Sequence, residues 1–594
     1  MLVERPTHPA RQYSCVSHCL TDQGVQTLST SEVFLRPADI PHARRETAAA
    51  MLASLLVLLG VYSYFWIRLY NGYLLIRDDP GNIGGTMAAG LRGWLTRGMA
   101  GYYHVYPEWP QPAFSNFYRP VWNLIIYVEQ TVFGQHYWAW FLAFCAVQYL
   151  GTLLFLRVVQ LLGVRSRPAL LFAILFLFNP AFLNFGFLYP GFQFDVFASL
   201  LLLAAFCLLL EYRYGSALAL VAVAVFMKET AIFAPIAAAI TVFIQKRDAK
   251  WSLAMLTPLA AWGAARWLAF HAVIGGTFES PSRIGDILIN FGRGLLVWPS
   301  GAIPPSFPLR LTGAHGIAMI ALLLVNAALW AILIYAGWRA VRALKRTPEH
   351  ADSKLQAILL IWVFGALSLC LLIRPQFRFG ASFYAFLLLF FAHFLFTRPW
   401  PKYAGLVPVL ILSFVTLLRA GDFLWHAIAT YSAQSSREKA LFAGLRSLPQ
   451  DGRSVFVVNA PGMLSAPVFI AWAWDLNLNI TFLDQAPGCQ SAGRNDGRYD
   501  LSSQSLSVEI PSCAYYVLAG VPLDIQSKAL MGSLLRPGVG MYQFPNPPGG
   551  DRHLSSGDID LGKAMRIRLT HPPRTMLAYD WQKGVYRTLG LGAR

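Results

Sequence analysis

The segment FQFDVFASLLLLAAFCLLLE, residues 192–211, decides the fold class of this chain. Its two acidic residues, Asp195 and Glu211, stand near its ends, and the residues between them are nearly all apolar. An α-helix needs about 20 residues of this kind to cross the hydrocarbon core of a bilayer. The segment therefore predicts a transmembrane helix.

Similar apolar segments recur along the chain and predict about eleven transmembrane helices, which makes a polytopic α-helical membrane protein. They lie near residues 47–70, 136–160, 168–188, 192–211, 214–227, 230–245, 251–274, 313–337, 355–373, 380–397 and 403–420. The segments 214–227 and 230–245 are short and are separated only by Lys228 and Glu229. They form either two short spans or one re-entrant pair.

The composition agrees with a membrane protein and excludes other classes. The chain has 594 residues, of which 56% are hydrophobic and only 13% are charged, whereas soluble domains carry about 25% charged residues. The net charge is nevertheless +18. A nucleic-acid-binding protein would combine such a charge with a charge-rich surface, so nucleic acid is excluded as a partner. Seven Cys in a chain of this length exclude a disulfide scaffold.

The distribution of Lys and Arg sets the orientation of the spans. Residues 1–46 are polar and lack the apolar stretch of a signal peptide, so we expect a cytoplasmic tail followed by a signal anchor. The inside loops then hold most of the loop cations: Arg157, Arg165, Arg167, Arg213, Lys246, Arg247, Lys250, Arg339, Arg342, Lys345, Arg346, Lys354, Arg398 and Lys402. We therefore expect a membrane core over residues 47–421. The protein would lie in the cell (inner or plasma) membrane, with its C-terminus outside.

The C-terminal segment, residues 422–594, differs from the membrane core. It is polar and rich in Gly and Pro, with short strand-like runs such as residues 454–458 and 514–518. Such runs between turn residues indicate strands. We expect an extracytoplasmic domain of mixed α/β or β-rich structure. The outer side is oxidising, so Cys489 and Cys513 are candidates for a disulfide, with two unpaired thiols as the alternative.

Ionisable side chains at membrane depth are costly and are therefore functional candidates. The predicted topology gathers them on the outer face, at span ends and in two large outer loops, about 71–135 and 276–312. They are Asp78, Asp79, Arg119, Asp195, Lys228, Glu229, Arg293, Arg374 and Arg378, with Tyr118 and Tyr384 beside them. Carboxylates opposite cations at a membrane surface are the groups needed when a hydroxyl attacks the phosphate ester of a lipid. The cations would hold the phosphate as a leaving group, and a carboxylate would take the proton of an acceptor hydroxyl.

Each motif also has a purely structural interpretation. Asp78-Asp79-Pro80 also fits a turn or a helix cap, and Tyr118-Arg119-Pro120 also fits an arginine that reaches toward the interface at a helix start. Arg374 and Arg378, spaced i,i+4, also fit headgroup anchors. Lys228-Glu229 also fits a neutralising pair, but adjacent residues do not face each other on a helix. Convergence on one face favours the functional interpretation.

Five short motifs follow one another along the predicted core. They are Ile76-Arg77-Asp78-Asp79-Pro80, Tyr118-Arg119-Pro120 with an amphipathic stretch that ends at Phe133-Gly134, Leu177-Phe178-Asn179-Pro180, Lys228-Glu229-Thr230, and Arg374 and Arg378 with Tyr384. In order and spacing they resemble the GT-C superfamily of integral-membrane glycosyltransferases, most of all the protein O-mannosyltransferase branch and its relatives with tetratricopeptide repeats. Two features depart from that pattern. Phe141 and Gln148 stand where relatives often carry His, and the tail lacks the repeat.

The resemblance implies an inverting transferase with a GT-C-like core. The donor would be a sugar linked to a polyprenyl phosphate in the membrane, an undecaprenyl phosphate in a bacterium. The acceptor would be a hydroxyl of a glycan, a lipid or a protein on the extracytoplasmic side. The membrane lipid and these two substrates are the expected partners.

The resemblance also implies roles for the site residues. Asp78 would be the general base with Asp79 in support, or the reverse. Phosphate binding would fall to Arg119, Lys228, Arg374 and Arg378. The supporting residues would be Tyr118, Asp195, Glu229, Arg293 and Tyr384, with Glu229 orienting Lys228 or the acceptor. A divalent cation at Asp78 and Asp79 stays open, because two adjacent carboxylates do not establish a metal site.

Two other functions stay open beside the transferase. A transporter or flippase of a lipid-linked glycan would carry an internal repeat and polar residues near mid-membrane, whereas here no repeat is evident and the charges lie near one surface. A non-catalytic scaffold for envelope assembly would tolerate replacement of its outer polar residues.

Overall fold

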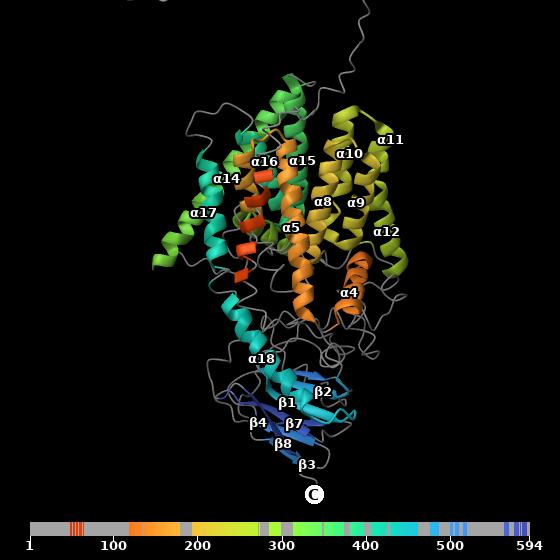
Figure 1. Ribbon diagram of the computed structural model, residues 1–594, viewed down its shortest axis with the longest axis vertical. Helices are drawn as coiled ribbons and strands as arrows, with labels where there is room; N and C mark the ends of the chain where they lie inside the picture. Colours follow the sequence, from red (N-terminus) through yellow and green to blue (C-terminus); the bar gives the residue numbers. More distant parts are fainter. Residues whose placement is uncertain are drawn as a thin grey trace, which may run out of the picture. The chain divides into compact units, whose positions relative to one another are not determined.

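The computed structural model describes the chain in parts, and Figure 1 names its elements. The described residues are 48–64 with gaps, 118–178 without 135, 193–270, 273, 284–298, 313–346, 350–372, 380–396, 406–422, 425, 428–460, 476–485 and short strands between 499 and 590. Most of them are helical. Residues 1–46 and most of the first outer loop therefore stay at the level of sequence predictions.

Helices make up the described membrane core. They are α4 (Pro120–Phe133), α5 (Tyr137–Leu161), α6 (Ser166–Leu177), α8 (Phe194–Leu210), α9 (Tyr214–Met227), the 3-10 turn η4 (Glu229–Ala231), α10 (Ala234–Lys246), α11 (Ala249–Ala254), α12 (Thr257–Phe270), α13 (Ile284–Val297), α14 (Gly313–Arg346), α15 (Ala351–Leu372), α16 (Ala381–Phe396) and α17 (Leu406–Asp422). Except for α4 and α13, which lie in the two predicted outer loops, they overlap the apolar segments predicted from residue 136 onward.

Four helices within the described part are long and apolar enough to cross a membrane by length and composition. They are Trp138–Leu161, Glu229–Lys246, Ile320–Arg346 and Ala351–Leu371. Shorter apolar helices are Met51–Val61, Ser166–Leu177, Phe194–Leu210, Tyr214–Met227 and Ala381–Phe396. The molecule is thus a mostly helical, membrane-embedded protein. The total of about eleven spans and the sidedness of the termini stay predictions.

The structure differs from the predicted spans at two places. The segment 251–274 is divided into α11 and α12 near Pro258, because proline lacks an N–H and its ring clashes with the carbonyl four residues earlier. The helix expected over 313–337 instead continues to Arg346 as the 34-residue α14. Its last turns contain basic residues but no Pro or Gly beyond Gly337, so nothing in the sequence ends the helix earlier.

Segments 214–227 and 230–245 form two antiparallel helices, α9 and α10. Lys246 at the end of α10 lies over the ring of Tyr212, 4.8 Å from its centroid, and over that of Tyr214, at 5.8 Å. The Tyr214 hydroxyl also donates to Gln245 Oε1 at 3.3 Å. The end of α10 therefore lies beside the start of α9, and the junction at Lys228 lies at the opposite end of both helices.

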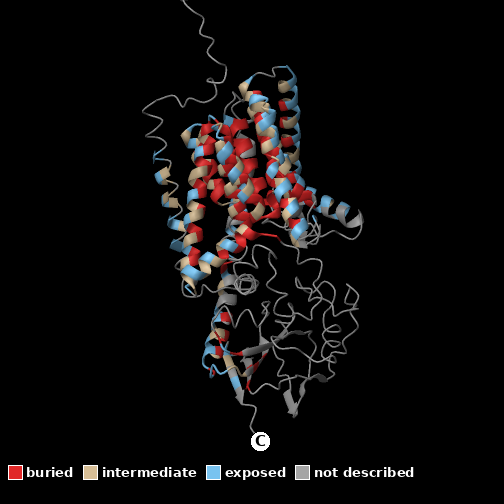
Figure 2. Ribbon diagram, turned by 90° about the vertical axis from the view of Figure 1, so that its right-hand side faces the viewer, coloured by how far each residue is buried: buried red, intermediate tan, exposed pale blue. Residues whose placement is uncertain are grey.

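The centre of the bundle is built by α8 and α16, whose residues are apolar on all sides and mostly buried. A helix without a polar face is stable only when other helices surround it. Here α8 packs on α5, α9 and α16, and α16 packs on α6 and α15. Rings of Phe206, Trp362 and Phe386 interlock between them, with centroids 4.7–5.6 Å apart. Figure 2 shows buried residues gathered in the middle of the bundle.

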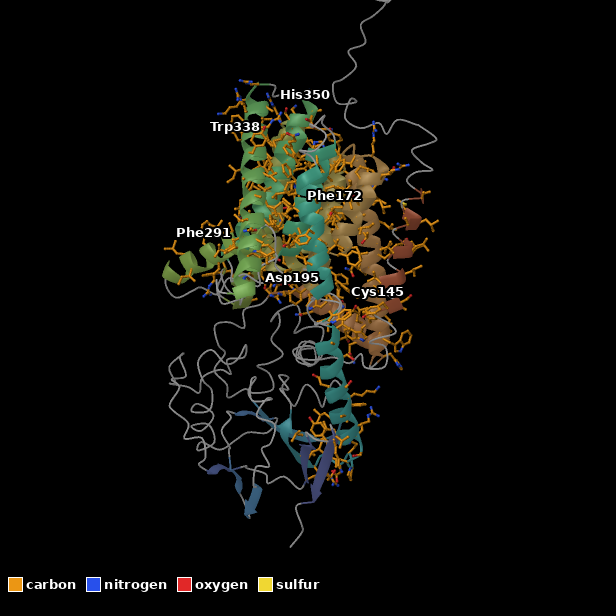
Figure 3. All side chains as sticks on the ribbon, turned by 90° about the vertical axis from the view of Figure 1, so that its left-hand side faces the viewer. Cys145, Phe172, Asp195, Phe291, Trp338 and His350 are labelled. Atoms are coloured by element: carbon orange, nitrogen blue, oxygen red, sulfur yellow. The ribbon has the colours of Figure 1, made fainter. Side chains whose placement is uncertain are left out.

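The two ends of the bundle carry different polar contacts. At one end, His393 of α16 contacts Asp352 of α15 at 3.0 Å and the carbonyl of Leu162 after α5, also at 3.0 Å. Asp195 lies at the other end, and Figure 3 shows it far from Trp338 and His350. Arg165 follows α5 just after Leu162, so this loop cation, which is predicted to face the cytoplasm, shares an end with His393. Asp195 and Lys228 share the opposite end.

The described residues of the C-terminal part form one helix and two sheets. Helix α18 (Ile428–Arg446) packs on β8. The strands are β1 (Ser454–Ala460), β2 (Asn479–Gln485), β3 (Tyr499–Ser502), β4 (Ser505–Glu509), β5 (Tyr515–Ala519), β6 (Ala564–Arg568), β7 (Thr575–Asp580) and β8 (Val585–Gly590). One sheet has the order β5-β2-β1-β7-β8 with β1 parallel to both neighbours, and the other has the order β3-β4-β6. Cys489 and Cys513 lie outside the described residues, so their disulfide stays a prediction.

Candidate functional site

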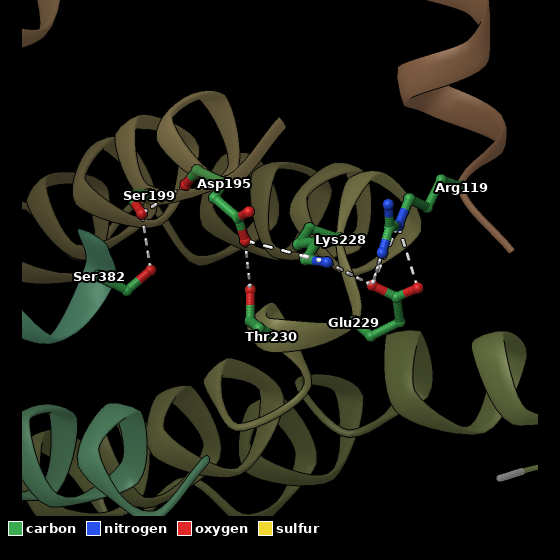
Figure 4. A network of polar contacts seen from close by, with 7 residues as sticks. All are labelled: Arg119, Asp195, Ser199, Lys228, Glu229, Thr230 and Ser382. Carbon is green, nitrogen blue, oxygen red and sulfur yellow. Dashed lines mark hydrogen bonds and ion pairs between the residues drawn. The ribbon is translucent and has the colours of Figure 1, made fainter. Parts of the chain in front are cut away.

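A network of buried charges lies at the Asp195 end of the bundle (Figure 4). Its side chains come from the start of α4, the start of α8 and the junction of α9 with η4. Pro120 begins α4 and leaves Arg119 as the residue before the helix. Lys228 ends α9 in an extended conformation, with φ −153° and ψ 133°. Helix ends thus bring residues that are far apart in the sequence to one place.

Arg119 and Glu229 form the strongest contact of this network. The Arg119 Nε donates to both Glu229 carboxylate oxygens, at 3.0 and 3.1 Å, and its Nη2 contacts Oε2 at 3.0 Å. The side chains are 5% and 0% exposed. Forked contacts of a guanidinium with a carboxylate are stronger and more directional than neutral hydrogen bonds. The pair therefore joins α4 to the α9–α10 junction.

Lys228 links the two carboxylates of the site. Its Nζ lies 3.1 Å from Glu229 Oε2 and 4.0 Å from Asp195 Oδ1. The ring of Phe194 lies beneath both cations, with Arg119 Cζ at 4.3 Å and Lys228 Nζ at 4.7 Å from its centroid. Two cations thus balance two carboxylates, which compensates charges that would be very costly to bury singly.

Hydroxyl groups extend the network toward α16. Thr230 Oγ1 donates to Asp195 Oδ1 at 3.4 Å. Ser199 Oγ contacts the Asp195 carbonyl at 2.7 Å and Ser382 Oγ at 2.8 Å. The site therefore spans α4, α8, the α9–η4 junction and the start of α16, and it is connected to the central helices.

Of the predicted site residues, the structure brings four together: Arg119, Asp195, Lys228 and Glu229. Two structural interpretations are corrected. Arg119 does not reach toward the interface, because it is buried and paired. The expectation that Lys228 and Glu229 would not face each other is wrong, because Lys228 has left the helix and its side chain turns back onto its neighbour.

Three other predicted residues take different places. Tyr118 is buried and its ring lies 6.2 Å from that of Phe226 on α9. Tyr384 is buried on α16 with its ring 5.5 Å from that of Trp298. Arg293 is exposed on α13 and forms no part of the charge network. Tyr118 and Tyr384 therefore pack around the site's supporting helices.

Four predicted site residues, Asp78, Asp79, Arg374 and Arg378, lie outside the described residues, so their roles stay predictions. The same holds for a divalent cation at Asp78 and Asp79. Within the part of the chain that the structure describes, no three His, Cys, Asp or Glu side chains group as metal ligands would.

The sequence prediction missed the neutral members of the network. Ser199 stands four residues after Asp195 in a segment that is otherwise nearly apolar, and this spacing places both on one helix face. That signal was present in the sequence. Ser382, which is 183 residues away from Ser199, carried no such signal.

Glu129 is a second feature that the sequence prediction missed. It lies on α4, the helix that Arg119 precedes, and its Oε2 is shielded from solvent with no hydrogen-bond partner among the described residues. Burial raises the pKa of this carboxyl from 4.5 to about 8. Leu124, Val128 and Val132 of the same helix are exposed, and Glu129 as a whole is half-buried. The helix thus shields one oxygen of a carboxyl that lies beside its exposed apolar residues.

Comparisons with known proteins are limited. No protein-family model and no curated protein matches the chain. Among solved structures the chain is similar to the arabinofuranosyltransferase AftD from Mycobacteria, with a TM-score of 0.38 and 16% sequence identity. The match covers 74% of this chain and 32% of AftD, so the chain spans only that smaller share of AftD's length. At this level of similarity AftD assigns no role to any residue here.

Replacement of Glu229 by Ala should strongly destabilise the protein. It leaves Arg119 and Lys228 buried without their shared carboxylate, and breaking a buried pair in this way costs about 3–5 kcal/mol. Unfolding of the detergent-solubilised protein measures the loss. The control is Glu211→Gln, which breaks a 3.7 Å pair with Arg157 whose side chains are 32% and 47% exposed; it should cost less than about 1 kcal/mol. Equal losses in both variants would show that the network is not energetically special.

The Glu129 carboxyl should make stability depend on pH. Because the folded protein binds this proton more tightly than the unfolded chain does, the stabilisation is full below about pH 4.5 and is lost as the pH rises through about 8. Glu129→Gln removes the titration but keeps the shape. The melting temperature of the variant should therefore fall less than that of the natural protein between about pH 5 and pH 9. If the melting temperatures of both proteins changed equally with pH, the raised pKa of Glu129 would be contradicted.

Proposed function

We propose that this protein is a membrane glycosyltransferase that moves a sugar from a polyprenyl-phosphate donor to an acceptor hydroxyl on the extracytoplasmic side. The observation that carries the proposal is the buried network of Arg119, Glu229, Lys228 and Asp195. It places two cations and two carboxylates at one end of a membrane bundle, on helix termini from three parts of the chain. Buried ionisable groups of membrane proteins are functional candidates by default.

The network supports phosphate binding because its cations are oriented in advance. Arg119 and Lys228 are each fixed by a carboxylate and by the ring of Phe194. A lipid phosphate at the same place can take over contacts that Glu229 and Asp195 now supply, without a large rearrangement of the cations. Donors that need no reorganisation stabilise developing negative charge best. The phosphate of the leaving polyprenyl group gains such charge during transfer.

The proposed reaction conserves charge and atoms in one step. The acceptor oxygen forms a bond to the anomeric carbon of the sugar while the bond from that carbon to the phosphate oxygen breaks. The acceptor proton passes to a carboxylate, for which Asp78 or Asp79 is the candidate. The polyprenyl phosphate leaves with the bonding electrons, and the proposed role of Arg119 and Lys228, with Arg374 and Arg378, is to stabilise it.

A reconstituted assay tests this function whichever sugar the donor carries. Purified protein in liposomes is supplied with a panel of synthetic undecaprenyl-phosphate sugars and a membrane extract as acceptor source, and mass spectrometry measures release of undecaprenyl phosphate. We expect release from one donor. Asp78→Asn with Asp79→Asn should abolish it, and Lys228→Met should lower it at least about tenfold through weaker use of the donor.

The control variant is Arg453→Gln, which removes a cation at an exposed ion pair with Asp451 in the C-terminal part. It should leave release unchanged. Movement of the intact donor across the bilayer without release would instead indicate a flippase. Full release of undecaprenyl phosphate by the variant that carries both Asp78→Asn and Asp79→Asn would contradict the transferase proposal.

A further inference from the structure

A stripe of aromatic and basic side chains runs along the last three turns of α14 and faces away from the bundle. The helix buries Leu333, Ala336 and Ala340 on one side. On the other side Tyr335 is 46% exposed and Trp338 is 55% exposed. The cations that follow at helical spacing are Arg339, Arg342, Lys345 and Arg346, of which all but the half-buried Arg339 are exposed. We call these six residues the α14 stripe.

The aromatic rings of the stripe hold its first two cations. Arg339 Cζ lies 5.9 Å from the centroid of the Tyr335 ring, and Arg342 Cζ lies 5.1 Å from that of Trp338. Such cation–π contacts orient a guanidinium without neutralising it. The positive charge is therefore presented outward in a preferred direction.

No acidic residue offsets this charge on the helix. The sequence of α14 contains no Asp or Glu. Across the residues that the structure describes, none of the four cations forms an ion pair. This contrasts with Arg119 and Lys228, whose charges are fully compensated inside the protein. Within the described part of the chain, the charge of the stripe is therefore available to a ligand from outside.

The length of α14 indicates what that partner is. At 1.5 Å per residue its 34 residues extend about 51 Å, whereas the hydrocarbon core of a bilayer is about 30 Å thick. Part of the helix therefore extends beyond the hydrocarbon core, and its basic last turns are the part that the core would exclude. Tyr and Trp prefer the headgroup level, and Lys and Arg just beyond it contact lipid phosphates. Figure 3 places Trp338 at the end of the bundle away from Asp195, so this surface is separate from the candidate active site.

We propose that the α14 stripe is a binding site for anionic phospholipid headgroups. Tyr335 and Trp338 lie at the interface, and Arg342, Lys345 and Arg346 contact the phosphates of the leaflet at that end. The site anchors this end of the bundle and selects acidic lipids, independently of the function proposed above.

Lipid competition tests this proposal on the full-length protein. Native mass spectrometry with equal amounts of phosphatidylglycerol and phosphatidylcholine measures which lipid stays bound. We expect the natural protein to prefer phosphatidylglycerol. Each cation near the surface contributes roughly a fivefold change, so Arg342→Gln with Lys345→Gln should lower the preference by up to about 25-fold. Trp338→Ala should weaken retention of both lipids.

The matched control is Arg165→Gln with Arg167→Gln, which removes two exposed cations for which the described residues show no aromatic contact. It should change the preference less than the α14 double variant does, because no aromatic ring among the described residues orients these two cations toward the headgroups. An equal effect of both double variants would overturn a specific site, as would the absence of any lipid preference in the natural protein. If the stripe instead joins two copies of the chain, the α14 variants will change the oligomeric state and leave lipid preference intact. Unchanged thermal unfolding confirms that all variants are folded.

Discussion

The ion pair of Arg119 with Glu229 is the contact on which the predicted outer end of the helical core depends. Neither charge tolerates burial alone, because an uncompensated ion in an apolar interior loses its hydration without replacement. The pair joins residues 110 positions apart and forces the start of α4 against the α9–α10 junction. Lys228 and Asp195 then complete a balanced set of four charges. The break in the helix at Lys228 is required by this geometry, since a helical Lys228 would point away from Glu229.

The protein uses its charges in two ways. At the Asp195 end they are buried, paired and held by rings and hydroxyl groups from α8 and α16. At the other end many lie exposed on helix surfaces, as in the α14 stripe, beside an exposed pair of Arg157 with Glu211 and a partly buried contact between His393 and Asp352. Buried pairs keep a cation in one orientation, which suits a defined phosphate. Exposed cations on long side chains adapt to a fluid layer of headgroups, which suits the surface of a membrane.

The sequence predicted the helical segments well because membrane helices have the strongest local signal that a sequence carries. The segments around α8 and α16 are apolar on every side, and their boundaries agree with the structure within a few residues. Local residues could also have predicted the division at Pro258 and the continuation of α14 to Arg346. They were missed because hydropathy alone defined the spans, and a basic helix end has low hydropathy.

The site was predicted in its residue types but not in its contacts. Arg119, Asp195, Lys228 and Glu229 were recognised as costly charges on one face, which requires only the topology. Their pairing depends on how α4 packs on α9, and no periodicity encodes a contact of that kind. The pairing of Lys228 with Glu229 was considered but given less weight, because adjacent residues do not face each other on a helix. Glu129 was overlooked because an acidic residue in an amphipathic helix ordinarily faces water.

The most direct measurement is a cryo-electron microscopy structure of the protein in nanodiscs with undecaprenyl phosphate, the expected product of transfer. The phosphate should lie within about 4 Å of the Arg119 guanidinium or of Lys228 Nζ, with at least one contact to Glu229 or Asp195 lengthened. A phosphate bound elsewhere, with the four-charge network unchanged, would contradict the role assigned to these cations.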